Sequence, residues 1–346
     1  MTSWLPTPRR LGRVAFDRAA ACTGVLALSE RVMRGRLTVL TFHRVLPDEL
    51  CREYLFDSLA VPASLFRAQA KVLAQRCHVV TLTDGIAALD SRRGDDRPMV
   101  AMTFDDGYAD NFSVAAPIMK AHGLPATFFV VAGLIGTAGE LWYDVAARRW
   151  LAATPSALVD GVRSIGAPVW WTTETKPSLP TWMAFLKRLP PDRRVEIIDK
   201  LSDPGRHAMR QPYDRLMTPE ELRSLRNDGH EIGSHTLTHP LLPQLSDAML
   251  QHELVTSRRL IEGWLNEPVL GFCYPNGDHD DRVVSATARA GYAYACLTRS
   301  GVNRPGVDRL RIRRVDMHPS RSCGLDNQFD ESSFRASISR LHEFHR

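Results

Sequence analysis

The chain has 346 residues, of which 44% are hydrophobic and 24% charged, and its formal net charge is +5. This composition is typical of a globular protein with one large α/β domain or two modest domains, and it contains no low-complexity tract or internal repeat. The small basic excess comes without a dense Lys/Arg tract or a nucleic-acid-binding module, so we expect no nucleic acid as a partner.

The six cysteines are scattered singly, without a Cys-x-x-Cys pair. This pattern favours free thiols in a reducing compartment over a disulfide framework. Near the N-terminus, residues 19–28 form a weakly apolar stretch that is too short to cross a bilayer and lacks the apolar core of a signal peptide. We therefore expect a cytoplasmic protein with an amphipathic helix there, packed on the domain, and peripheral membrane contact as the alternative.

The first part of the chain alternates short apolar runs with segments of helical spacing. In chain order we expect a strand at 37–43, a helix at 62–76, a strand at 99–104, a helix at 109–122 and a strand at 126–132.

Beyond Gly136 the alternation is lost until about residue 213. Five of the seven tryptophans lie in this stretch: Trp142, Trp150, Trp170, Trp171 and Trp182. Their rings could stack on sugars at the rim of a groove, or form the core of a small lid subdomain. We favour the core, with Trp142 as the exception because it lies close after the third strand.

The alternation resumes at Thr218, which begins a helix as an N-cap followed by Pro219 and two glutamates. The expected elements are helices at 218–227, 246–265 and 282–290 and strands at 231–234, 269–274, 292–297 and 310–317. Strands that alternate with helices predict a parallel sheet. Polar residues follow several of these strands, and in a parallel barrel the loops after the strands open on one face: His43, Asp105, Asp106, His235 and Asn276.

Two segments carry the chemistry, TFDDGY at 103–108 and HTLTHP at 235–240. The second places two imidazoles four residues apart, close enough to share one ion if the backbone turns helically there. One Asp and two His can hold a divalent metal with positions left open, while the other Asp acts as a base on water. This set could hydrolyse an amide or an ester, although each segment alone also fits a turn, a cap or a strand end.

The two segments in this order resemble the polysaccharide deacetylase family (NodB-homology domain, carbohydrate esterase family four), and the strand ending at His43 resembles its exopolysaccharide-biosynthesis subgroup. The resemblance covers about residues 37–317 and implies a distorted, incomplete parallel (β/α) barrel. We divide the chain into an N-terminal helical extension at 1–35, the barrel at 36–330 with a Trp-rich helical insertion at about 137–215, and a C-terminal helix or tail at 331–346.

The resemblance implies that Asp105 is the catalytic base and that Asp106, His235 and His239 hold the metal ion. The ion is expected to be zinc, although cobalt, nickel or manganese also suit these donors. The segment at 272–277 is similar to the family's third motif, which forms a wall of the groove and holds the oxyanion with a backbone N–H near its Tyr. The expected substrate-binding residues are Tyr108, Trp142, Tyr274, Pro275 and Asn276.

The sequence departs from the family at Cys273, where many members have an Arg that orients the base. We expect Arg314 to supply that cation instead. The family's fourth motif, an Asp-rich Trp segment, is not evident. For the general acid that protonates the leaving amine we favour His43, with His318 as the alternative, because an imidazole titrates near neutrality.

The resulting prediction is a metal-dependent N-deacetylase that acts on N-acetylhexosamine in a bacterial surface polysaccharide or its precursor, such as a glycolipid. Two alternatives stay open: hydrolysis of another acyl or C–N substrate, and a glycan-binding protein without activity.

Overall fold

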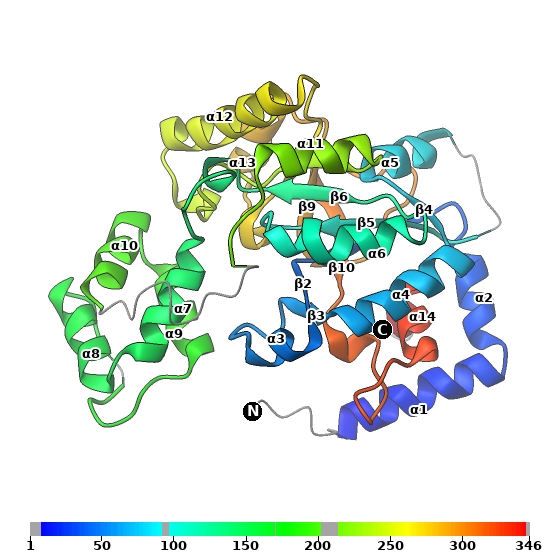
Figure 1. The fold of residues 1–346 in the computed structure, drawn as a ribbon, viewed down its shortest axis with the longest axis horizontal. Coiled ribbons are helices and arrows are strands. Elements are labelled where there is room, and N and C mark those ends of the chain that lie inside the picture. Colours follow the sequence, from blue (N-terminus) through cyan, green and yellow to red (C-terminus); the bar gives the residue numbers. More distant parts are fainter. Residues whose placement is uncertain (1–7, 92–96, 170, 202–213, 344–346) are drawn as a thin grey trace.

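Seven parallel strands form a closed barrel at the centre of the molecule (Figure 1). The computed structural model describes residues 8–91, 97–169, 171–201 and 214–343. Around the barrel the strands are β1 (Leu37–Phe42), β5 (Met99–Phe104), β6 (Thr127–Val130), β7 (Glu231–Ser234), β8 (Gly271–Cys273), β9 (Tyr294–Ser300) and β10 (Ile312–Asp316), which pairs again with β1. Barrels of this type usually have eight strands, so the predicted incomplete parallel (β/α) barrel is confirmed.

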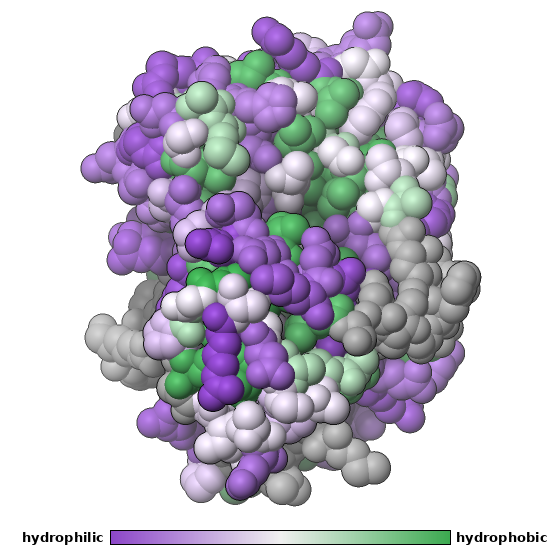
Figure 2. Space-filling view, turned by 90° about the vertical axis from the view of Figure 1, so that its left-hand side faces the viewer, coloured by the Kyte–Doolittle hydropathy of each residue, from purple (hydrophilic) through white to green (hydrophobic). Residues whose placement is uncertain are grey.

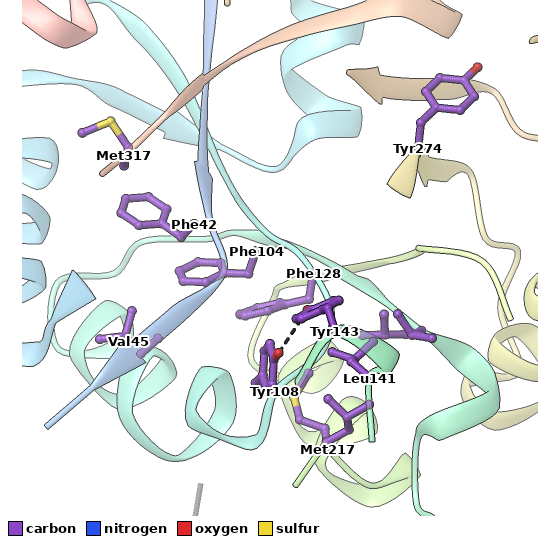
Figure 3. Close-up of a cluster of buried hydrophobic side chains, with 14 of the residues drawn as sticks. Phe42, Val45, Phe104, Tyr108, Phe128, Leu141, Tyr143, Met217, Tyr274 and Met317 are labelled. Carbon is purple, nitrogen blue, oxygen red and sulfur yellow. Dashed lines mark hydrogen bonds between the residues drawn. The ribbon is translucent and has the colours of Figure 1, made fainter. Parts of the chain in front are cut away.

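Strand β1 pairs with β5 along its whole length, and every residue of both strands is buried. The rings of Phe42, Phe104 and Phe128 stack in a row, with centroids 5.2 and 4.9 Å apart (Figure 3). Strands buried on both faces have nearly continuous apolar sequences, which is why both were recognisable. This packing holds the carboxyl ends of the two strands together, where His43 and Asp105 follow.

Helices surround the barrel: α4 (Ala63–Arg76), α5 (Leu82–Ser91), α6 (Ala116–Lys120), α11 (Pro219–Asn227), α12 (Asp247–Leu265) and α13 (Asp281–Arg289). The strands and helices expected at 37–132 and 218–317 are confirmed, with ends that shift by a few residues. Thr218 is the N-cap of α11, as its sequence predicted, and it forms a capping box with Glu221.

Several short elements were not predicted: β2 (Arg44–Leu46), α3 (Asp48–Glu53), β3 (Ala60–Pro62), β4 (His78–Val80) and α5. Strands β2 and β3 form a separate parallel pair, and β4 pairs with the first half of β5. Three-residue strands are too short to produce a periodic pattern. The helix expected at 109–122 also begins differently, as a π-helical turn (Asn111–Ala115) before α6.

The described part of the insertion contains four helices, at the left of Figure 1: α7 (Trp142–Ala152), α8 (Pro155–Ser164), α9 (Leu179–Arg188) and α10 (Pro191–Lys200). Trp182 is fully buried and packs against Trp171 and Phe185. The expectation that tryptophans form a core is therefore confirmed for this group, whereas Trp170 lies outside the described residues. Figure 2 views the molecule from the side of the insertion, and on this face hydrophobic patches lie between hydrophilic ones.

The N-terminal extension contains two helices, α1 (Pro8–Cys22) and α2 (Val25–Val32), so the single helix expected at 19–28 was wrong. Gly24 breaks it with φ = 79°, a left-handed conformation that favours glycine. The C-terminal helix α14 (Glu331–Ile338) packs against α1, and its Phe334 belongs to the same buried cluster as the barrel phenylalanines. No helix in the described ranges is both long and apolar enough to cross a membrane.

Candidate active site

The two aspartates that follow β5 are buried, and their side chains diverge. Asp106 and Gly107 have φ of 75° and 85°, so the chain turns sharply between the carboxylates. A Cβ on Gly107 would lie 3.1 Å from Val130 Cβ, so the turn requires glycine for space as well as for conformation. Positive φ at a non-glycine residue is a strain that proteins retain mainly at functional sites.

Asp106 lies between the two histidines of the HTLTHP segment. Its Oδ1 is 3.5 Å from His235 Nε2 and 3.4 Å from His239 Nε2, and all three side chains are buried. Ligand atoms placed about 2.1 Å from a tetrahedral zinc ion lie roughly 3.4 Å apart. The three donors therefore fit a divalent metal ion.

The surroundings of the two imidazoles favour the protonation states that metal binding requires. His235 Nδ1 lies 2.7 Å from the carbonyl oxygen of Cys273, a contact that places its proton on Nδ1 and leaves the Nε2 lone pair free. Burial lowers the pKa of His239 to about 3, which keeps that ring neutral, as a ligand must be.

The two histidines approach Asp106 without the helical turn that their spacing of four residues would allow. Thr236 and His239 both have positive φ, and the loop between them is irregular. Glu253 on α12 shapes this loop, because its carboxylate accepts hydrogen bonds from the backbone N–H groups of Leu237 and Thr238. The Glu253 carboxylate thus accepts the backbone N–H groups of this loop, which a helical turn would otherwise have paired with backbone carbonyls.

Asp105 lies beside the triad, with a carboxylate oxygen within 4.8 Å of a ring nitrogen of His235, and pairs with Arg314 of β10. The guanidinium donates from Nη1 to Oδ1 at 2.8 Å and from Nη2 to Oδ2 at 2.7 Å, and both side chains are almost fully buried. Burial alone would raise the pKa of Asp105, but the Arg314 guanidinium holds it well below its ordinary value. Asp105 is therefore ionised at neutral pH.

Cys273 lies where the family's Arg was expected, beside this ion pair. Its Sγ is 3.5 Å from Asp105 Oδ2 and 3.1 Å from Arg314 Nη2. Burial raises the pKa of the thiol, which stays protonated. Asp105, His235 and Cys273 also lie close enough together to share an ion. However, the guanidinium contacts two of these three groups, so a second cation is disfavoured there.

Of the two candidate acids, His43 lies closer to the base. Its Nε2 is 3.9 Å from Asp105 Oδ2, and 20% of its side chain is exposed, compared with 10% or less for the triad. His318 instead caps a short 3₁₀ turn, where its Nδ1 accepts the backbone N–H of Ser320. Burial lowers the pKa of His318. His43 is thus placed at the exposed edge of the site.

The sequence model of a protein family described as polysaccharide deacetylase matches residues 92–295, which is more than half of the chain. The chain belongs to the polysaccharide deacetylase family. YxkH of Bacillus subtilis, which is named after the same family, is 20% identical over 299 residues, covering 86% of this chain and 77% of that protein. The peptidoglycan-N-acetylglucosamine deacetylase of Bacillus cereus is 34% identical over 88 residues, 25% of this chain and 38% of its own length.

Solved structures of deacetylases share this fold. The Streptococcus pyogenes deacetylase PplD, solved with acetate, superposes with a TM-score of 0.56 at 18% identity and covers 84% of this chain and 96% of its own. IcaB from Ammonifex degensii gives a TM-score of 0.55 at 18% identity and covers 88% and 97%. At such identity the likeness shows a common barrel, and the residue roles come from the geometry above.

In this member of the family, a tyrosine of the insertion holds Asp106, the candidate metal ligand. Tyr143 Oη donates to Asp106 Oδ2 at 2.8 Å. Tyr108 Oη lies 3.0 Å from Tyr143 Oη and 2.7 Å from Asp144 Oδ2 (Figure 3). Burial raises the pKa of Asp144 to about 7. Tyr108 is only 1% exposed, so the expectation that it binds substrate was wrong; it supports the ligand from behind.

Replacing Tyr143 with Phe should weaken divalent-metal binding about 10- to 100-fold, because Asp106 loses the hydrogen bond that orients it. Metal titration by calorimetry measures this change. Tyr294→Phe is the matched control, since it also removes the hydroxyl of a buried tyrosine, one that donates to Glu231 at the start of β7, the end of the strand away from His235. Equal metal affinity in the two variants would show that Tyr143 has no part in the site.

The third-motif residues occupy positions that differ from the expectation. Tyr274 is fully buried, donates from Oη to the Leu310 carbonyl and lies apart from the Tyr108–Tyr143 pair (Figure 3). Its backbone N–H donates to Cys296 O, so it is not available to an oxyanion. Pro275 is buried too. Tyr274 and Pro275 therefore support the wall from inside, which corrects their assignment as substrate contacts.

Asn276 and Trp142 connect the insertion to the barrel. The Asn276 side chain is exposed and accepts a hydrogen bond from Lys187 Nζ of α9 at 2.6 Å. Trp142 Nε1 donates to the carbonyl of His239, while the Arg194 guanidinium covers one face of the indole. Trp142 thus lies beside the triad, and the other face of its ring stays a candidate surface for a sugar.

Proposed function

We propose that this chain is a metal-dependent hydrolase that removes acetyl groups from N-acetylhexosamine residues of a bacterial surface polysaccharide or its precursor. The observation that carries the proposal is a buried, ionised Asp105 beside a three-donor set that fits a divalent ion. Relatives named for peptidoglycan N-acetylglucosamine and for chitooligosaccharides support an N-acetylglucosamine-type substrate.

Asp106, His235 and His239 would hold the ion, and zinc suits them best among zinc, cobalt, nickel and manganese. When bound, such an ion supplies Lewis acidity, which polarises a carbonyl and lowers the pKa of water. Asp105 accepts a proton from the attacking water, because Arg314 keeps it ionised without removing its acceptor lone pairs. His43 donates a proton to the departing nitrogen, so the carbon–nitrogen bond breaks to give acetate and a free amine.

Metal content and acetate release, measured together, test this proposal. We expect the wild type to hold about one divalent ion per chain and to release acetate from N-acetylglucosamine oligomers. His235→Ala should lose both. A metal-loaded wild type that releases no acetate from any N-acetylated sugar would refute the deacetylase and point to another acyl substrate, or to glycan binding alone.

The same assay separates the two candidate acids. His43→Gln should slow acetate release about a hundredfold, whereas His318→Gln should stay near the wild type, because its imidazole caps a turn. The reverse order would move the acid role to His318.

A further inference from the structure

A basic cavity of about 940 Å³ lies on the flank of the barrel, alongside β9 and β10. The chain passes from β9 to β10 without a covering α-helix, through residues 301–308 and a 3₁₀ turn at Arg309–Arg311. We call this cavity the arginine groove, because six arginines line it: Arg36, Arg299, Arg304, Arg311, Arg313 and Arg340.

The groove contains far more positive than negative charge. Asp308 is the one acidic residue among those that line it, and its carboxylate is already bonded to Arg311. The formal charge of the lining is therefore +5 with His279 neutral, the same as that of the entire chain. The rest of the protein is formally neutral, so the basic excess of the sequence is concentrated here.

Four of these arginines, Arg36, Arg299, Arg304 and Arg313, form no ion pair with any carboxylate in the described ranges. Burial, together with the nearby Arg304 guanidinium, lowers the pKa of Arg36. Clustered like charges repel and destabilise a fold. The stability of the fold therefore does not explain why these arginines are grouped together, whereas the binding of an anionic ligand would explain it.

The arrangement favours one kind of anion. Planar guanidinium groups match the oxygens of a phosphate in paired hydrogen bonds. Because several of these guanidinium groups have no carboxylate partner in the described ranges, a ligand that neutralises them must carry several negative charges within a few ångströms. A phosphate or diphosphate provides this density, because one phosphate carries about −1.5 to −2 charge on three acceptor oxygens, whereas an acidic sugar chain spreads its carboxylates along the chain. We propose that the arginine groove binds a phosphate or diphosphate group, carried by a membrane lipid or by a soluble molecule.

The groove and the candidate active site lie on opposite faces of the same strand. Arg313 of β10 is exposed toward the groove, and the next residue, Arg314, points into the barrel to Asp105. His279, which also lines the groove, stacks on Tyr274 of the third motif. The proposal does not depend on the deacetylase reaction, since none of the metal or base residues line the groove.

Calorimetric titration with inorganic pyrophosphate tests the proposal on the full chain. The double variant Arg299→Gln/Arg313→Gln should bind pyrophosphate at least about tenfold more weakly than the wild type. The control Arg259→Gln/Arg289→Gln removes the same charge from exposed positions outside the groove and should bind like the wild type. If the first variant does not fold, Arg36→Gln/Arg304→Gln replaces it.

Flotation with vesicles distinguishes the two sources. Binding to phosphatidylglycerol vesicles but not phosphatidylcholine vesicles, lost in the groove variant and kept in the control, assigns the phosphate to a lipid. Pyrophosphate binding without flotation assigns it to a soluble molecule. Equal pyrophosphate affinity in all variants, or a wild type that binds neither pyrophosphate nor vesicles, would overturn the proposal.

Discussion

Asp105→Asn should lower the turnover number for acetate release roughly a thousandfold while the metal content stays unchanged. The amide has the shape of the carboxylate but cannot take a proton from water. The proposed metal donors are Asp106, His235 and His239, so the ion should remain. Steady-state acetate release and elemental analysis of the same sample measure the two quantities.

The control for this variant is Asp228→Asn, an isosteric change at a surface aspartate that pairs with Lys120. It should keep wild-type activity. An Asp105→Asn enzyme with near-normal turnover would remove Asp105 from the mechanism. Loss of the metal in that variant would instead make Asp105 a ligand.

Arg314→Met should destabilise the fold by about 3–5 kcal/mol at neutral pH, because it leaves the buried Asp105 charge without its partner. It should also move the acidic limb of the pH–activity profile upward. In the wild type, the guanidinium holds the pKa of Asp105 below its ordinary value. Without it, burial raises that pKa, and the base is protonated over part of the working range.

The pH dependence of stability has a definite sign. In the wild type the folded pKa of Asp105 is depressed, so the pair stabilises the fold above the ordinary carboxyl pKa, and this stabilisation is lost as the pH falls through the lowered pKa. In Arg314→Met the folded pKa is raised, so stability is lost as the pH rises. The difference in unfolding free energy between the two proteins should therefore be largest at neutral pH and shrink in acid.

Denaturant unfolding at several pH values measures this difference. Arg309→Met is the matched control, because Arg309 forms an exposed ion pair with Asp90 and such pairs contribute less than about 1 kcal/mol. A cost for Arg314→Met no larger than for Arg309→Met would mean that Asp105 does not depend on Arg314 for its charge.

The sequence was most informative where structure and chemistry are local. Strands β1 and β5 are continuous apolar runs, and each ends directly before a candidate residue, His43 or Asp105. Interactions between distant segments were harder to predict. Arg314 meets Asp105 across 209 residues; only the absence of the family's Arg at position 273 suggested it.

Other parts of the site gave no local signal. Tyr143 reaches Asp106 from a helix of the insertion, and nothing in its own sequence context distinguishes it from a core tyrosine. The histidine loop is irregular because Glu253 lies behind it, a residue that belongs to another helix. The arginines of the groove are spread between positions 36 and 340, so no charge run marks them.

Strand β10 shifts its register against β9 between Ile312 and Arg314. Alternate residues of a strand face opposite sides, so a slip of one position exchanges the two faces. Here the pairing advances four residues along β9, from Cys296 to Ser300, but only two along β10, so the two extra residues leave the alternation of β10 intact. This alternation aims Arg314 at Asp105 and leaves the adjacent Arg313 facing outward. The connection at 301–311 should consequently accept substitutions more readily than a change of length, since one residue gained or lost would aim the wrong guanidinium at the base.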